Sequence, residues 1–237
     1  MLALLYDIHG NVRGLDAVLE DAAQQGADAY FIGGDVALFG PWPEATVARL
    51  RELQPATWIR GNGERWTANR EDAPEFLRGA TDATRNALGD ELVAEHAALP
   101  GSAAVADGTR AWHGSPVSDV RSFTPEPGDD EAELLAGVEE SRLIFGHTHL
   151  PFARMASNDG RPVELVNPGS VGMPLDGDHR AAYALLREDG TIEHRRVAYD
   201  HHAVIAELRD RFGETSWHDR VAHRFTHARM ETATKPS

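Results

Sequence analysis

Seven side chains of the types that hold divalent metal ions follow expected strands along the sequence. In open α/β sheets the loops at the carboxyl ends of the strands meet at one crevice, so we expect these side chains to converge. Seven oxygen and nitrogen donors are about the number needed for two adjacent ions that share one carboxylate. The sequence therefore predicts a dinuclear metal site with these ligands: Asp7, His9, Asp35, Asn62, His113, His147 and His149.

Two pairs of these residues have a spacing that suits a shared cluster. In Asp7-x-His9 and His147-x-His149 one residue separates the two side chains. An extended backbone places side chains two positions apart on the same side of the chain. Each pair can therefore face the same metal cluster.

Glycines accompany the ligands, where the backbone must turn sharply. Each of these glycines directly precedes a ligand: Gly34, Gly61 and Gly146. Taken singly, the motifs have simpler interpretations, because Asp-x-His and Gly-Asp occur by chance in many chains. His113 could equally be a hydrogen-bonded core histidine, and 146–149 could be a polar turn. The order of the motifs after successive strands favours the metal site.

The elements that must position these residues alternate between strands and helices in the first part of the chain. Short apolar runs predict buried strands at 2–6, 27–32 and 57–59, and helical spacing predicts helices from residue 12 and over 44–53. This order predicts a βαβαβ unit.

Strands dominate the second part of the chain. A hairpin is expected to turn at Asp107-Gly108, between strands at 102–106 and 109–112. The remaining expected elements are a helix over 129–138, strands at 143–145, 152–155, 163–166, 182–186 and 192–197, and a last helix over 202–212.

The pattern predicts one domain over residues 1–213 with a helical insertion at about 64–100 that lies over the strand ends. The polar, weakly patterned residues 214–237 are expected to form a loosely attached C-terminal tail.

Composition narrows the classes of function. The chain has 237 residues, of which 41% are hydrophobic, enough to bury a substantial core. A formal net charge of −15 argues against stable nucleic-acid binding or electrostatic attachment to a membrane. The absence of cysteine excludes thiolate metal sites and cysteine nucleophiles.

The apolar run at the N-terminus is too short for a signal or membrane segment, so we expect a cytoplasmic protein. The oligomeric state stays open.

The ordered motifs resemble the calcineurin-like metallophosphoesterase superfamily over residues 7–186. The series is Asp7-x-His9, Gly34-Asp35, Gly61-Asn62-x-Glu64, His113 and Gly146-His147-x-His149. The phrases Asp7-Ile8-His9-Gly10-Asn11, His113-Gly114-Ser115-Pro116 and Asn167-Pro168-Gly169-Ser170-Val171-Gly172 resemble its small bacterial branch. The resemblance implies an α/β fold, a four-layer α/β/β/α sandwich of two mixed sheets flanked by helices, and hydrolysis of a small phosphoester.

The resemblance also implies roles for individual residues. One metal would be held by Asp7, His9, Asp35 and His149, and the other by Asp35, Asn62, His113 and His147. Asp35 would bridge the two ions, and the catalytic residues would be Asp7, Asp35, Asn62 and His113. Two cations a few Å apart lower the pKa of a shared water, so that a bridging hydroxide can attack phosphorus. We expect Asn11, Arg60, Glu64, Asn167 and Ser170 to shape the site or the substrate loop.

Gly63 departs from the family pattern, because much of the superfamily has a histidine there that assists the leaving group. Loss of such a general acid typically lowers the rate by roughly a hundredfold to ten-thousandfold. Phosphodiesters with good leaving groups, or nucleotide-type substrates, are therefore favoured. Arg60 or His179 could supply the missing donor. The alternatives are a phosphomonoesterase or protein phosphatase, and a metal-binding interaction scaffold of the same fold.

The donor set and the aromatic residues bear on the ligands. Mixed imidazole and carboxylate donors favour Mn, Fe, Zn or Ni over Mg or Ca. Phe39, Trp42 and Trp66 follow the second and third motifs and could stack on a nucleobase. Ordinary packing of these large aromatic side chains is the alternative.

Overall fold

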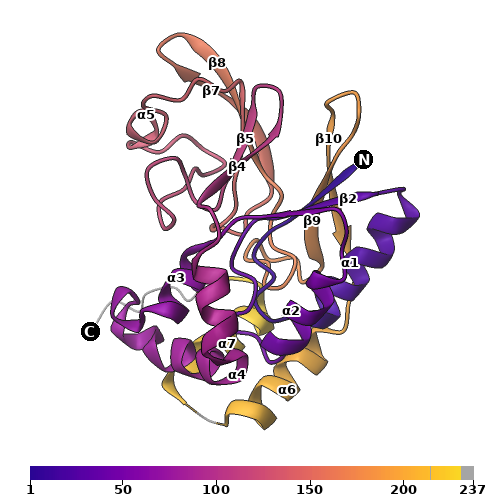
Figure 1. Ribbon diagram of the computed structural model, residues 1–237, viewed down its shortest axis with the longest axis vertical. Helices are drawn as coiled ribbons and strands as arrows, with labels where there is room; N and C mark the ends of the chain where they lie inside the picture. Colours follow the sequence, from indigo (N-terminus) through magenta and orange to yellow (C-terminus); the bar gives the residue numbers. More distant parts are fainter. Residues whose placement is uncertain (214, 231–237) are drawn as a thin grey trace.

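Two five-stranded sheets form the centre of the protein. The computed structural model describes residues 1–213 and 215–230. The first sheet has the order β10-β9-β1-β2-β3 and the second the order β4-β5-β6-β8-β7 (Figure 1). The strands of the first sheet are β1 (Leu2–Leu5), β2 (Ala29–Ile32), β3 (Ala56–Trp58), β9 (Ala181–Leu186) and β10 (Ile192–Val197).

The first sheet contains the βαβαβ unit that the sequence predicts. β1 pairs with β2 in parallel, with Leu2 opposite Ala29, and β2 pairs with β3 in parallel. Helices α1 (Val12–Gln24) and α2 (Pro43–Arg51) make the two crossovers and bury apolar residues against the sheet. Parallel strands end at the same edge, so the residues after β1, β2 and β3 meet there.

The second sheet is built from two hairpins around a parallel centre. Its strands are β4 (Ser102–Ala106), β5 (Thr109–Trp112), β6 (Arg142–Ile144), β7 (Phe152–Asn158) and β8 (Arg161–Asn167). β4 and β5 pair antiparallel as predicted, as do β7 and β8, whereas β5, β6 and β8 run parallel. The loops after β5 and β6 therefore leave this sheet at one edge.

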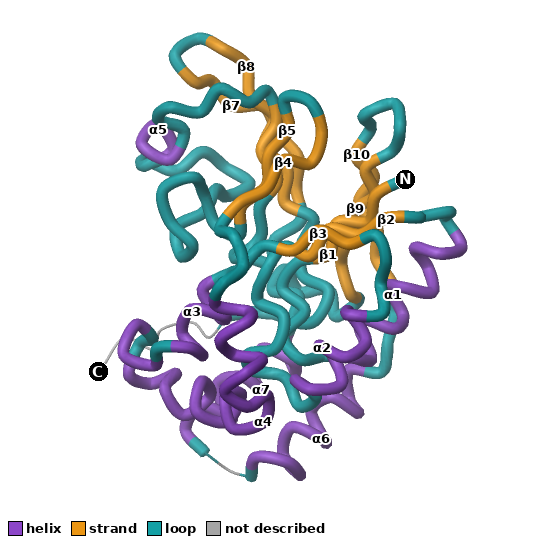
Figure 2. Tube along the Cα trace, in the orientation of Figure 1, coloured by secondary structure: helices purple, strands orange, loops and turns teal. Residues whose placement is uncertain are grey.

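The layers follow the predicted α/β/β/α order. Residues such as Leu4, Phe31, Ile144 and Val166 fill the core between the two sheets. Most helices lie on the outer side of the first sheet, whereas loops and α5 (Glu131–Leu134) cover the second (Figure 2). The helix expected over 129–138 is thus confined to one turn, and Gly137 shortly after it adopts a left-handed φ of 76°.

The expected helical insertion is present next to the strand ends. It comprises α3 (Asn62–Ala68), two short 3₁₀ segments, η1 (Arg70–Asp72) and η2 (Glu75–Leu77), and α4 (Arg78–Ala97). Among the described residues, no helix is long and apolar enough to cross a bilayer.

The prediction of a loosely attached tail is wrong for residues 216–227. These residues form α7 (Ser216–His227), which follows α6 (His201–Phe212). Trp217, Val221 and Phe225 of α7 are buried in a cluster that includes Val204 and Leu208 of α6. Charged residues and histidines between these apolar positions concealed their helical spacing of four residues. Residues 231–237 of the expected tail lie outside the described residues.

The loop after β1 packs directly against the backbone at Gly172. A Cβ atom on Gly172 would lie 1.7 Å from the Ile8 carbonyl oxygen, which real structures do not tolerate. We predict that Gly172→Ala lowers the free energy of unfolding by about 1–3 kcal/mol, because the backbone must shift to admit the methyl group. Gly101→Ala is the matched control, since nothing lies within 4 Å of its Cβ position. Urea denaturation of both variants measures the difference, and equal stability would contradict the close packing.

Candidate metal centre

The structure brings all seven metal-type residues to the meeting edge of the two sheets. Asp7 and His9 follow β1, Asp35 follows β2, and Asn62 begins α3 after β3. From the second sheet, His113 follows β5, and the pair at 147 and 149 follows β6. The convergence that the sequence predicts is therefore present in the fold.

Backbone strain is concentrated in these loops. Among the described residues, eight non-glycine residues have positive φ, and five of them are metal-type residues: Asp7, His9, Asp35, His147 and His149. Left-handed backbone is unfavourable for side chains with a Cβ and persists only where the surroundings enforce it. The loops therefore hold their side chains in fixed directions at an energetic cost.

One buried group consists of Asp7, His9 and His149. The Nε2 atoms of the two histidines lie 3.1 Å apart, and Asp7 Oδ1 lies 3.5 Å from His149 Nε2. His9 Nδ1 is 2.9 Å from the Leu38 carbonyl oxygen and His149 Nδ1 is 2.5 Å from that of Met173. These carbonyls accept the Nδ1 protons, so the two Nε2 atoms point toward each other. A cation held there could be bound by both nitrogens.

A second buried group consists of Asp7, Asp35 and His113. His113 Nδ1 donates to the Gly33 carbonyl oxygen at 2.9 Å, which leaves Nε2 directed to the carboxylates. Nε2 lies 3.5 Å from Asp35 Oδ1 and 3.8 Å from Asp7 Oδ1. The other oxygen of Asp35, Oδ2, lies 3.8 Å from His9 Nε2. The Asp35 carboxylate thus has one oxygen on each group.

Asn62 and His147 complete the second side of the cluster. The side-chain amide of Asn62 lies 3.1 Å from His113 Nε2 and 2.8 Å from His147 Nδ1. The backbone N–H of His147 donates to Asp7 Oδ2 at 3.0 Å. The sequence placed Asp7 with one metal only, but its carboxylate contacts residues of both groups.

The pKa values of the cluster reflect its burial and the charges of its neighbours. Burial alone would raise the pKa of Asp7, but the neighbouring imidazoles, His149 first, hold it well below its ordinary value. Burial, together with the negative charges of Glu64 and Asp7, raises the pKa of Asp35 to about 7, against the opposing effect of His113. Burial lowers the pKa of His147 to about 4, and the charge of His113 adds to this effect. Asp7 Oδ1 has no hydrogen-bond partner among the described residues.

Glu64 holds two ligand-bearing loops together, in keeping with its expected orienting role. Its buried carboxylate accepts hydrogen bonds from the backbone N–H groups of Asp35 at 2.9 Å, Val36 at 2.8 Å and Gly61 at 2.6 Å. Three donors to one ionised group make strong, short hydrogen bonds. Glu64 therefore fixes Asp35 relative to the start of α3.

The other three loop residues also tie ligand-bearing segments together. Asn11 caps α1 by accepting from Gly14 N at 3.0 Å and donates to the Gly172 carbonyl oxygen at 2.7 Å. Asn167 donates to the Gly146 carbonyl oxygen at 3.1 Å. The Ser170 hydroxyl donates to the Asp7 carbonyl oxygen at 2.7 Å. Asn167 and Ser170 thus contact the backbone at or beside a metal-type residue, whereas Asn11 joins the start of α1 to Gly172.

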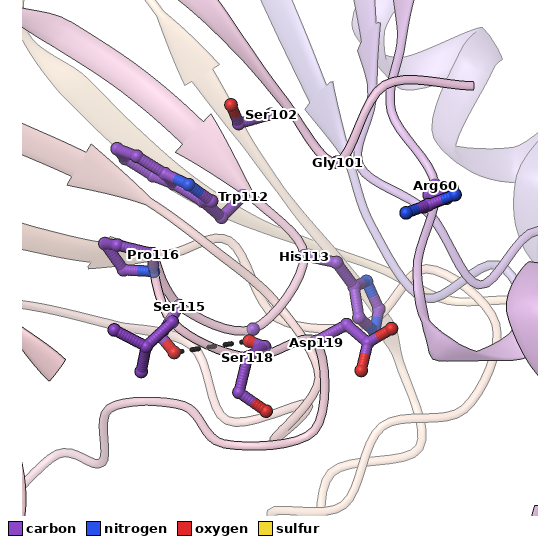
Figure 3. Close-up of a pocket in the computed structure, with 11 residues that line it drawn as sticks. Arg60, Gly101, Ser102, Trp112, His113, Ser115, Pro116, Ser118 and Asp119 are labelled. Atoms are coloured by element: carbon purple, nitrogen blue, oxygen red, sulfur yellow. Dashed lines mark hydrogen bonds between the residues drawn. The ribbon is translucent and has the colours of Figure 1, made fainter. Parts of the chain in front are cut away.

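The two proposed substitutes for the missing histidine have different positions. Arg60 donates to the Ala97 carbonyl oxygen at 2.9 Å and lines a cavity of about 350 Å³ together with His113 and Asp119 (Figure 3). His179 instead interacts with α7, through Nε2 and the Thr226 carbonyl oxygen at 2.9 Å. Arg60 thus lines a cavity that the metal-type residue His113 also borders.

Sequence reasoning missed Asp119, which borders the cluster. Its carbonyl oxygen lies 3.1 Å from the Asn62 amide, and its carboxylate accepts two hydrogen bonds of 2.7 Å from Arg65. This bidentate ion pair attaches the loop after His113 to α3. No motif marks Asp119, because its position depends on the path of an irregular loop.

Comparison with known proteins agrees with the geometry. A family model for the calcineurin-like phosphoesterase superfamily domain matches residues 1–191. The chain belongs to this superfamily. It is therefore a phosphoester hydrolase that depends on metal ions, as the order of its motifs predicted.

Two curated relatives and one solved structure are similar over most of the chain. Uncharacterized protein MJ0912 of Methanocaldococcus jannaschii is 28% identical and covers 84% of this chain and 88% of its own length. Phosphodiesterase YfcE of Escherichia coli is 26% identical and covers 88% of this chain and 98% of its own length. The crystal structure of a metallophosphoesterase from Sphaerobacter thermophilus has a TM-score of 0.80 at 26% identity, covering 96% of this chain and 98% of its own.

Replacement of Glu64 tests its role in the site. We predict that Glu64→Gln lowers the free energy of unfolding by about 1–3 kcal/mol, because an amide cannot accept from all three buried N–H groups. The affinity for Mn²⁺ should fall by roughly tenfold to a hundredfold, since Asp35 loses its support. Urea denaturation and calorimetric titration measure the two effects. The exposed Glu188→Gln is the control, and matching values for both variants would disprove the role.

Metal uptake should release protons below neutral pH. The raised pKa values of Asp35, at about 7, and of His113 mean that the pair retains protons which a cation must displace. The affinity for Mn²⁺ should therefore fall as pH drops through about 7, and level off above that value. Calorimetry in buffers of different ionisation enthalpy counts the protons, and we expect more release at about pH 6 than at about pH 8.5. Equal release at both pH values would contradict the prediction.

Proposed function

We propose that the chain hydrolyses a small phosphodiester with two divalent metal ions held at this cluster. The observation that carries the proposal is the Asp35 carboxylate, whose two oxygens lie 3.8 Å and 3.5 Å from histidine nitrogens of two different buried groups. A carboxylate with one oxygen on each side is suited to bridge two adjacent cations.

The residues divide into two ligand sets. One ion would be held by His9 and His149 with Asp7 and Asp35. The other would be held by His113, His147 and Asn62 with Asp35. Asp7 Oδ1 lies 3.5 Å from His149 Nε2 and 3.8 Å from His113 Nε2, so Asp7 contacts both sets.

The cluster fits cations in three respects. Asp7 Oδ1 is buried and has no hydrogen-bond partner in the part of the chain that the structure describes. Backbone carbonyls direct the Nε2 atoms of His9 and His149 toward each other, 3.1 Å apart. The mixture of imidazole and carboxylate donors suits Mn, Fe, Zn or Ni better than Mg or Ca.

Bound cations supply a nucleophilic water and neutralise the phosphate oxygens. The residues of the chain position these ions and leave little freedom to the donors. Carbonyl oxygens fix the rings of His9, His113 and His149, and Glu64 fixes the backbone at Asp35. Preorganised ligands of this kind need no rearrangement during the reaction.

Gly63 supports a preference for diesters. Its N–H donates to Asp35 Oδ1 at 2.6 Å, and a Cβ atom there would lie 2.8 Å from that oxygen and 3.1 Å from Asp35 Cγ. A Cβ atom at this position would therefore press against the proposed bridging carboxylate, which would have to shift. Gly63 thus makes a close backbone contact with the carboxylate, and it provides no general acid where a histidine could provide one. Diesters with good leaving groups need least protonation, and the relative YfcE is named a phosphodiesterase.

The proposal predicts a metal-dependent diesterase activity. Metal-stripped protein supplied with Mn²⁺ should hydrolyse bis-p-nitrophenyl phosphate with a kcat/KM about tenfold or more above that for p-nitrophenyl phosphate. Asp35→Asn should lower turnover at least about a hundredfold, because the bridging ligand loses its charge. Release of nitrophenolate measures both, and Asp107→Asn, in an exposed hairpin turn, is the control.

The other outcomes identify the rival functions. A higher kcat/KM for the monoester would indicate a phosphomonoesterase instead. Failure to hydrolyse either compound, with Mn²⁺ binding demonstrated by calorimetry, would favour an interaction scaffold.

A further inference from the structure

A second cavity of about 240 Å³ adjoins the metal-type residues on the side of His9, Asp35 and His149. Its other walls are largely apolar and come from separate parts of the chain. Phe39 follows β2, Trp66 lies in α3, Phe76 lies in η2, and Arg224 and Met230 come from α7 and the residues after it. The cavity therefore joins the proposed reaction centre to an aromatic surface.

The C-terminal segment completes this cavity. The matched family model ends at residue 191, so Arg224 and Met230 lie outside the matched range. α7 packs against α4 and η2, which brings it to the insertion that also carries Trp66 (Figure 1). This wall of the cavity therefore comes from the C-terminal segment, outside the range of the family model.

Two large apolar side chains are exposed at this cavity. Phe76 is 50% exposed and Met230 is 55% exposed, and both line the cavity. Single exposed apolar residues are ordinary on protein surfaces, but two that border one cavity beside a reaction centre indicate a surface that a ligand covers.

Trp66 adds a polar group to the apolar wall. The side chain is only 8% exposed, and its indole Nε1 has no hydrogen-bond partner among the described residues. An unsatisfied buried N–H is unfavourable by about 1–3 kcal/mol, so it marks a place where a ligand acceptor would be stabilising. A purely hydrocarbon ligand could not use this group.

Two guanidinium groups lie against aromatic rings of the cavity wall, and one of them, that of Arg224, also lines the cavity. Arg224 Cζ is 5.7 Å from the centroid of Phe39, and Arg220 Cζ is 5.0 Å from that of Phe76. Flat cations and aromatic rings are the groups on which nucleobases stack in proteins. Trp42 is the remaining aromatic residue for which the sequence suggests stacking on a base. It does not line this cavity, and its ring centroid lies 5.3 Å from Arg13 Cζ.

We propose that this cavity binds the base of a nucleoside phosphodiester, and that Phe76, Met230 and Trp66 determine the preference for that substrate. The proposal rests on the diesterase function described above. Ring faces, an N–H donor and guanidinium groups together match a flat heteroaromatic ring with acceptor atoms. A volume of about 240 Å³ is smaller than the roughly 300–1,000 Å³ of sites for drug-sized ligands, so it suits one base.

Two diesters with the same leaving group test the preference. Thymidine 5′-(p-nitrophenyl phosphate) and methyl p-nitrophenyl phosphate both release nitrophenolate, so they differ only in the second ester group, a nucleoside or a methyl group. We expect a kcat/KM ratio of about ten or more in favour of the thymidine ester for Mn²⁺-loaded wild-type protein. The double variant Phe76→Ala, Met230→Ala should lower this ratio about fivefold to tenfold.

The matched control is Met155→Ala on β7, because Met155 is 60% exposed and lies on the other sheet. Its ratio should equal that of the wild type. A wild-type ratio near one, or a double variant that behaves as Met155→Ala does, would overturn the proposal. Preference for a long alkyl ester over the thymidine ester would overturn it as well, in favour of an acyl or alkyl group in the cavity.

A binding measurement separates this proposal from the diesterase function. Calorimetric titration of the Mn²⁺-loaded protein with AMP and with ribose 5-phosphate compares ligands that share the phosphate and differ in the base. We expect AMP to bind about tenfold or more tightly, with the difference reduced in the double variant. Equal affinities would refute base recognition even if diesters are hydrolysed. Tighter binding of AMP without any turnover would instead refute the diesterase function and leave base recognition standing.

Discussion

The site depends on backbone carbonyl oxygens that fix the direction of three buried imidazole rings. Leu38, Gly33 and Met173 each accept the Nδ1 proton of one ring, so the opposite nitrogen faces the carboxylates. Without these acceptors the rings could rotate and satisfy the carboxylates directly. The carbonyl oxygens therefore keep the cluster short of hydrogen bonds and ready for cations, as in other metal sites with oriented histidines.

The same requirement explains the strained loops and their supports. Left-handed backbone at Asp7 and Asp35 aims the carboxylates inward, and such conformations persist only when neighbouring contacts enforce them. Glu64 and Ser170 provide those contacts by binding the backbone of the ligand-bearing loops rather than the ligands. Gly63 belongs to this arrangement, because its N–H holds the carboxylate against which a Cβ atom there would press.

The C-terminal helix forms part of the wall of the cavity that is proposed to hold the substrate's base. α7 buries Trp217, Val221 and Phe225 in a cluster with α6 and the insertion. This apolar contact holds Arg224 in the wall of a cavity that His9, Asp35 and His149 also line. The residues proposed for base recognition come from the insertion and the C-terminal segment.

The sequence by itself determined the βαβαβ order, the hairpin at Asp107 and the identity of the seven metal-type residues. Apolar runs, turn residues and ligand types are local properties, and they can be recognised within short segments. Only the tertiary structure decided that Asp7 contacts both groups, that Asp119 borders Asn62, and that α7 reaches the cavity. These contacts join distant segments; His9 and His149, for example, are 140 positions apart. Their partners are chosen by how the two sheets and the helices pack, and no local pattern in the sequence encodes that choice.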